Sequence, residues 1–81
     1  MDNKWLARRY EYLTAAEWEV LVRGVAKGLT NPEIAEDRGT SRKTVETQVH
    51  AILRKLDVSS RTEAAIYAFR NGLMDEGGDE P

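Results

Sequence analysis

The sequence predicts an all-α fold, a single small domain of four helices. Its 81 residues leave room for one modest core, and contents of 41% hydrophobic and 32% charged residues suit a soluble, helical chain. Four residues with short polar side chains each precede a segment whose apolar residues fall on one side of a helix. This pattern is typical of capped amphipathic helices. These candidate caps are Thr14, Asn31, Ser41 and Ser60.

The first predicted helix begins after Thr14, which has the spacing of a capping box with Glu17. It is expected to run to about Lys27, with Gly28 in the position that follows its end. Gly24 inside this segment costs the helix about 1 kcal/mol relative to alanine. We therefore expect another backbone to pack closely against Gly24.

A short helix, a turn and a longer helix follow in the middle of the chain. Asn31 is expected to cap the short helix, with Pro32 at its first position, where a missing N–H does no harm. Gly39 ends this helix, because glycine readily adopts the left-handed conformation of a turn. Ser41 then caps a helix over residues 42–56, which contain neither glycine nor proline. Two helices joined in this way form the bihelical unit that DNA-binding proteins use.

The helix over residues 42–56 has two contrasting sides. Its apolar stripe contains Val45, Val49, Ile52, Leu53 and Leu56. Its opposite side carries charged or hydrogen-bonding side chains over about four turns, namely Lys43, Glu46, Thr47, His50 and Arg54. Such a side is usually no more than a solvated surface. The short helix and turn before it favour a second interpretation, in which this side binds a partner.

Charged residues are segregated along the chain, although the net charge of −2 by itself argues against a nucleic-acid partner. Residues 38–61 contain six Lys or Arg and two Asp or Glu, whereas residues 11–37 contain two basic and six acidic residues. The tail from residue 75 has four acidic residues and no basic one. Because local charge matters more than the sum, the positive part of the chain indicates an anionic partner.

The last predicted helix spans about residues 61–71 and begins with a second capping-box pair, Ser60 and Glu63. Two of its sides are largely apolar. One side contains Ala64, Tyr67 and Ala68, and the other contains Thr62, Ala65, Ile66 and Phe69. So small a domain has no room to bury both sides, unless its core wraps the helix more fully than expected. We therefore expect the second side to be a dimer face.

No pattern of residues indicates catalysis, so we do not expect an enzyme. The sequence has no cysteine, and therefore neither a disulfide framework nor a cysteine zinc site. Its single histidine, His50, has only Glu46 within reach one turn away, and no phosphate-cradling glycine-rich loop is present. We expect no metal, no cofactor and no small-molecule ligand. No stretch has the pattern of a signal peptide or a membrane span, which predicts a cytoplasmic protein without membrane contact.

A series of short motifs extends from Leu13 to about Leu73, roughly three quarters of the chain. In order they are Leu13-Thr14 with Glu17, Gly28-Leu29-Thr30-Asn31, Glu33-Ile34-Ala35, Ser41 with Lys43-Thr44-Val45, Lys55-Leu56, Ser60-Arg61-Thr62-Glu63-Ala64, and Ala68 with Arg70, Gly72 and Leu73. Together they resemble the LuxR/GerE-type helix-turn-helix, the DNA-binding domain of many bacterial response regulators and quorum-sensing activators. Residues 13–74 are expected to form this domain.

The resemblance implies a compact transcription regulator that binds double-stranded DNA as a homodimer, with RNA polymerase as a further candidate partner. The helix over residues 42–56 would enter the major groove, and the last helix would pair with its copy. Carried over by position, the base-reading residues are Glu46, Thr47 and His50, and the phosphate-binding residues are Lys43, Thr44, Gln48 and Arg54. Phosphate contacts position such a helix, while side chains on its groove side read base edges.

Four positions depart from the family pattern. Gln48 stands where the family most often has histidine, and its amide still donates to a phosphate. Glu46 stands where cationic or polar residues are common; phosphates repel a carboxylate, but it accepts a hydrogen bond from cytosine N4. Arg38 and Thr40 replace apolar residues of the turn, which we expect to be looser for that reason.

The domain context and the mode of action have alternatives. The family domain usually follows a receiver or ligand-binding domain, whereas only residues 1–12, an arm or a short extra helix, precede it here. The Met1 start and the acidic tail of residues 75–81, expected to be disordered, favour a stand-alone, GerE-like regulator over an excised domain. The alternative function is a helix-turn-helix that pairs with another regulator and modulates it without reading DNA. Glu46 and the apolar last helix favour that alternative.

Overall fold

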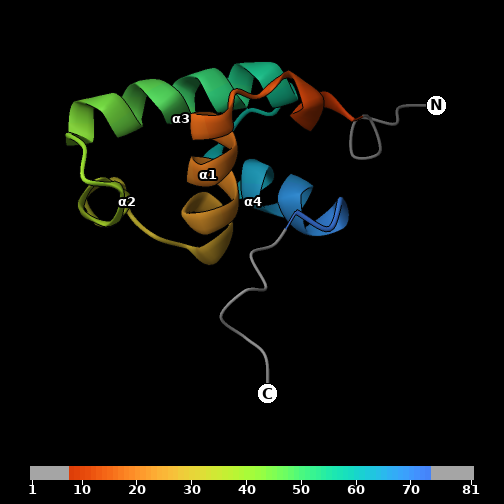
Figure 1. Cartoon of the computed structure of the whole chain (residues 1–81). Helices are drawn as coiled ribbons and strands as arrows, with labels where there is room; N and C mark the ends of the chain where they lie inside the picture. The colour runs from red at the N-terminus through yellow and green to blue at the C-terminus, as the bar shows by residue number, and fades with distance from the viewer. Residues whose placement is uncertain (1–7, 74–81) are drawn as a thin grey trace.

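The computed structural model describes residues 8–73, which fold into four α-helices and two 3₁₀ helices. The α-helices are α1 (Ala15–Arg23), α2 (Asn31–Arg38), α3 (Arg42–Leu56) and α4 (Arg61–Arg70), and the 3₁₀ helices are η1 (Arg9–Tyr12) and η2 (Val25–Lys27). Since the described residues contain no strand, the all-α prediction is confirmed. α3 lies along one side of the domain, with α1, α2 and α4 beneath it (Figure 1). The predicted acidic tail and residues 1–7 of the predicted arm lie outside the described residues.

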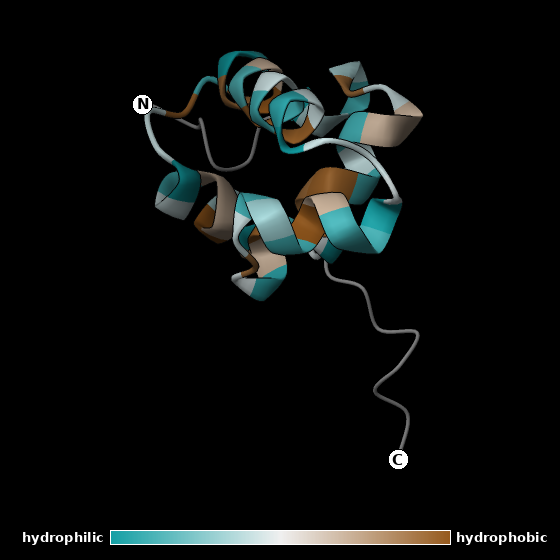
Figure 2. Cartoon of the chain, turned by 90° about the vertical axis from the view of Figure 1, so that its left-hand side faces the viewer, coloured by the Kyte–Doolittle hydropathy of each residue, from teal (hydrophilic) through white to brown (hydrophobic). Residues whose placement is uncertain are grey.

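All four helices bury apolar side chains in one core. Hydrophilic residues lie mostly on the outer sides of the helices, and hydrophobic ones gather where the helices face one another (Figure 2). Tyr67 of α4 is the largest fully buried side chain, and its hydroxyl accepts a hydrogen bond of 3.2 Å from the backbone N–H of Tyr10 in η1. The buried apolar residues are Val20, Leu21, Val22, Val25, Ile34, Ala35, Val45, Val49, Ile52, Leu56, Val58, Ala64, Tyr67, Ala68 and Leu73.

The first helix begins as predicted but ends earlier than expected. Its capping box is complete: the Thr14 hydroxyl accepts from the Glu17 N–H at 3.1 Å, and the Glu17 carboxylate accepts from the Thr14 N–H at 2.9 Å. α1 ends at Gly24 rather than near Gly28, and the chain continues as η2. A Cβ on Gly24 would lie 2.6 Å from Cδ1 of Ile34. Gly24 therefore accommodates a side chain of α2, not another backbone as expected.

The second helix is capped one residue earlier than predicted. The Thr30 hydroxyl accepts from the Glu33 N–H, and the Glu33 carboxylate accepts from the Thr30 N–H at 2.8 Å, so Thr30 completes a capping box. Pro32 accordingly occupies the second helical position instead of the first. The side-chain oxygen of Asn31 is engaged elsewhere, because it accepts a hydrogen bond of 2.7 Å from Arg61 at the start of α4.

The turn between α2 and α3 has the predicted conformation. Gly39 is left-handed, with φ of 68°, and its N–H bonds to the Glu36 carbonyl at 3.3 Å. The Thr40 N–H bonds to the Ala35 carbonyl at 3.0 Å, which completes a Schellman motif. Ser41 caps α3 as predicted, since its hydroxyl accepts from the Thr44 N–H at 3.1 Å.

The last helix follows the predicted bounds, and the core buries only one of its two apolar sides. Ser60 caps it, while the Glu63 carboxylate accepts from the N–H of Ser59 instead of Ser60. The side with Tyr67 is buried. On the second side Ile66 is 39% exposed and Phe69 is 73% exposed. The core therefore does not surround α4. Burial of both apolar sides, which was the alternative to a dimer face, is wrong.

Candidate nucleic-acid interface

The outer side of α3 carries the predicted polar residues, because the packing of its opposite side fixes how the helix is rotated. The side chains that anchor it in the core are Val45, Val49, Ile52 and Leu56. Five of the predicted residues line one surface hollow together with Ala51, namely Lys43, Glu46, Thr47, His50 and Arg54. All five are exposed. We call this set the α3 outer face.

Charged groups of the α3 outer face have no intramolecular partner. Within residues 8–73, the side chains of Lys43, Glu46, His50 and Arg54 form no ion pair and no hydrogen bond. Charged residues outside this face do pair: Glu19 lies 3.2 Å from Arg23 along α1, and Lys55, on another side of α3, lies 2.7 Å from Glu17. No internal bond of these side chains would therefore have to break for an external partner to contact them.

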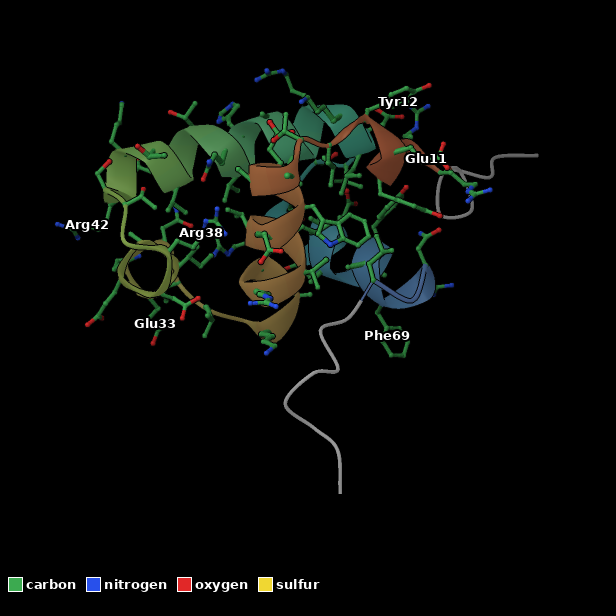
Figure 3. The ribbon with its side chains drawn as sticks, in the orientation of Figure 1. Glu11, Tyr12, Glu33, Arg38, Arg42 and Phe69 are labelled. Carbon is green, nitrogen blue, oxygen red and sulfur yellow. The ribbon has the colours of Figure 1, made fainter. Side chains whose placement is uncertain are left out.

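The start of α3 adds anion-binding capacity to this face. The amides of a first helical turn have no carbonyl partner within the helix, and the helix dipole makes this end positive. The Thr44 hydroxyl accepts a hydrogen bond of 3.0 Å from the Ser41 hydroxyl, so its own proton is left to donate outward. Arg42, which the sequence analysis did not single out, points away from the domain at this end of α3 (Figure 3). It has no intramolecular partner among the described residues. The feature of the sequence that could have identified Arg42 is its position in the first helical turn, directly after the Ser41 cap.

Gln48, a predicted phosphate ligand, is half-buried at the flank of α3. Its side-chain oxygen is buried and accepts no hydrogen bond from the described residues. Arg38 at the end of α2 shows a similar feature, because its Nε is buried without an acceptor in the same part of the chain. Six of the seven predicted DNA-binding residues thus lie exposed along α3, and Gln48 is the exception. Their roles remain predictions.

An ion pair between distant parts of the chain holds α3 in place. Oε1 of Glu17 accepts both the Thr14 N–H and the Lys55 ammonium, the latter at 2.7 Å. Glu17 is the one charged residue that is buried in the described part of the chain. Burial by itself would raise the pKa of Glu17, but the hydrogen bonds from Lys55 and Thr14 outweigh it, so that pKa lies below its ordinary value. The cap was predictable from the sequence, whereas the ion pair with Lys55 was not.

A second hollow lies on the exposed side of α4, away from the α3 outer face. It is lined by Thr62, Ala65, Ile66, Phe69 and Arg70, which include all four residues of the predicted dimer face. Phe69 points away from the core on the side of the domain opposite α3 (Figure 3). The two surfaces therefore do not overlap.

A helix-turn-helix that presents an unpaired polar face on its second helix is typical of DNA-binding transcription regulators. Residues 11–68 match the sequence model of a protein family that is described as "Bacterial regulatory proteins, luxR family". The chain belongs to this family, as the motifs had indicated. No helix among residues 8–73 is long and apolar enough to cross a membrane.

Individual relatives agree with the family match. The response regulator protein VraR of Staphylococcus saprophyticus is 48% identical over 71 residues, and VraR of Staphylococcus aureus is 48% identical over 68 residues. These matches cover 88% and 84% of this chain, but 34% and 32% of the relatives. The chain thus spans about a third of the length of these relatives.

Proposed function

We propose that this chain binds double-stranded DNA sequence-specifically as a homodimer and thereby regulates transcription. The observation that carries the proposal is the α3 outer face, whose charged side chains are exposed and unpaired. α3 has 15 residues, about 22 Å of helix, and a major groove about 12 Å wide admits such a helix.

The residues of α3 fall into two proposed roles. Glu46, Thr47 and His50 lie on adjacent turns of the outer face, where a helix in the groove meets base edges. The proposed phosphate ligands are Lys43, Thr44, Gln48 and Arg54. Cations and hydroxyls at the margins of a groove-bound helix reach phosphate oxygens, which set the position of the helix without reading sequence.

We propose that a second copy of this chain covers the exposed side of α4. Phe69 and Ile66 are large apolar side chains, and exposed groups of this kind mark interaction surfaces when they lie together. A twofold dimer uses the same surface on both copies. Because this surface does not overlap the α3 outer face, pairing through α4 leaves both copies of α3 free for DNA.

A salt titration of binding to duplex DNA tests the proposal. A protein that neutralises phosphates loses affinity steeply as salt rises, because it releases condensed counterions. Selection of bound sites from random duplexes then tests dimer binding, since a symmetric dimer selects two related half-sites at a fixed spacing. Absence of binding even at low salt, together with tight pairing to another regulator, would instead establish the protein-binding alternative.

A further inference from the structure

Glu46 is the acidic residue of α3, and it stands in the middle of the outer face. Lys43 lies three residues before it and His50 four residues after it, at spacings where opposite charges on a helix can pair. Neither forms a bond with Glu46, and the carboxylate has no partner anywhere among residues 8–73. Both of its oxygens therefore remain available to an external donor.

A carboxylate at this position weakens general binding to DNA. The backbone of duplex DNA carries one negative charge per about 1.7 Å of axis, which repels Glu46 when α3 enters the groove. A neutral residue at this position would remove that repulsion at every site. Glu46 therefore favours binding only where the groove offers a hydrogen-bond donor that compensates for this repulsion, and it discriminates against sites without one.

The four bases differ in what they offer a carboxylate, which only accepts hydrogen bonds when ionised. Guanine presents two acceptors, N7 and O6, and thymine presents the O4 acceptor and a methyl group. Adenine presents the N6 amine directly beside the N7 acceptor, which repels the second carboxylate oxygen. Cytosine presents its N4 amine with no acceptor on the same base edge in the major groove.

We propose that Glu46 makes this chain select cytosine at one position in each half-site, through a hydrogen bond from cytosine N4. This inference rests on the proposed DNA-binding function and deepens it by naming the base. His50, one turn further along the same face, lies where its imidazole can donate to N7 or O6 of a guanine. A C·G pair satisfies both residues, because it places the amine and the two acceptors side by side in the groove.

Selection from random duplexes with the full chain and with the Glu46→Gln variant tests this inference. The native chain is expected to select cytosine at one position per half-site. Glutamine both donates and accepts, and it pairs with N6 and N7 of adenine, so the variant is expected to select adenine there. Because Glu46 is exposed and makes no internal bond, the variant keeps the fold, which circular dichroism verifies.

The Glu36→Gln variant is the matched control. Glu36 on α2 is also exposed, and its side chain also has no partner within residues 8–73, so this variant removes the same charge from another element. It is expected to select the same bases as the native chain. A shift from cytosine to adenine in both variants would show a general charge effect and would overturn the inference.

A chemical probe isolates the cytosine amine. In a selected duplex, the cytosine is replaced by 2-pyrimidinone, which lacks the exocyclic amine. The native chain is expected to lose about tenfold in affinity, the value of one charge-assisted hydrogen bond, and Glu46→Gln is expected to lose much less. Equal losses of affinity in the native chain and the Glu46→Gln variant would overturn the inference and leave DNA binding intact. Selection of the same base by both proteins would do so too. Failure of both proteins to retain any duplex at low salt would overturn the proposed function itself.

Discussion

The Lys55 ammonium lies 2.7 Å from Oε1 of Glu17, an oxygen that also accepts the N–H of Thr14. One buried carboxylate thus closes the cap of α1 and holds the C-terminal half of α3 against it. The rotation of α3, and with it the direction of its outer face, depends on this contact as well as on the apolar stripe.

Replacing Lys55 with methionine is expected to destabilise the domain by about 2 kcal/mol, because it leaves the Glu17 carboxylate buried without its cation. The free energy of unfolding from urea titration measures this loss. Lys43→Met, which removes an unpaired lysine from the same helix, is the matched control and should change stability by less than about 0.5 kcal/mol. Equal effects of the two variants would contradict the structural role of the pair.

Acidification is expected to destabilise the domain through Glu17. Its pKa is lower in the folded chain than the ordinary value of 4.5, so the unfolded chain binds a proton more readily between the two values. The stabilising contribution is complete above pH 4.5 and is lost as pH falls through the lower, folded pKa. Unfolding measured between pH 7 and pH 3 should show this loss, and Glu17→Gln should remove that part of the pH dependence. A variant that keeps the whole acid dependence would contradict this assignment.

Gly24→Ala is expected to destabilise the domain by about 1–3 kcal/mol through overpacking. Its new Cβ would lie 2.6 Å from Cδ1 of Ile34 and 2.7 Å from the Val20 carbonyl oxygen. Cγ1 of Ile34 would also lie 2.7 Å from this Cβ. Ile34→Ala removes both Cγ1 and Cδ1, so thermal unfolding of the double variant should show a combined loss smaller than the sum of the single losses. Strict additivity would show that Ile34 is not the obstacle.

Asp57→Gly is expected to stabilise the domain by about 0.5–1 kcal/mol. Asp57 ends α3 with φ of 60°, a left-handed conformation that glycine adopts more easily. The variant loses an ion pair with Arg9 at 3.9 Å, but both side chains are substantially exposed and such pairs contribute little. Asp57→Ala loses the same ion pair without gaining conformational freedom, so it should not stabilise. A gain in both variants by thermal unfolding would argue against the conformational explanation.

Phe69→Asp is expected to convert a dimer into a monomer without unfolding it, because Phe69 is 73% exposed. Sedimentation measures the oligomeric state, and binding to duplexes with one or two half-sites measures its effect on DNA affinity. Tyr12→Asp is the control, since Tyr12 is similarly exposed at 70% but lies outside the exposed side of α4. An unchanged oligomeric state in the Phe69 variant would exclude that side as the dimer face.

Helix starts could be predicted from the sequence because their hydrogen bonds are local. Thr14 and Ser41 bond to an amide three residues ahead, and the left-handed Gly39 closes α2 through two bonds within five residues. The outer side of α3 was equally accessible, since one continuous apolar stripe leaves only one way to rotate the helix. The family motifs then pointed to DNA as the partner of that side.

Long-range packing decided what local patterns left ambiguous. Thr30 and Asn31 are both suitable caps, and Arg61 from α4 engages the Asn31 oxygen while Thr30 caps the helix. Gly24, which follows the last residue of α1, packs against the Ile34 side chain of α2, and the pair of Glu17 with Lys55 joins residues 38 positions apart.

The sequence alone determined four amphipathic helices, three of their four caps and the polar side of α3, because each depends on neighbours within a turn or two. Because both apolar sides of α4 have the same periodicity, only the tertiary structure could establish that the core buries the side with Tyr67. The core accepts Ala64, Tyr67 and Ala68 and leaves Ile66 and Phe69 exposed. It also decided which charges pair: Glu17 and Lys55 pair across the fold, whereas the charges on the outer side of α3 have no such neighbour within residues 8–73.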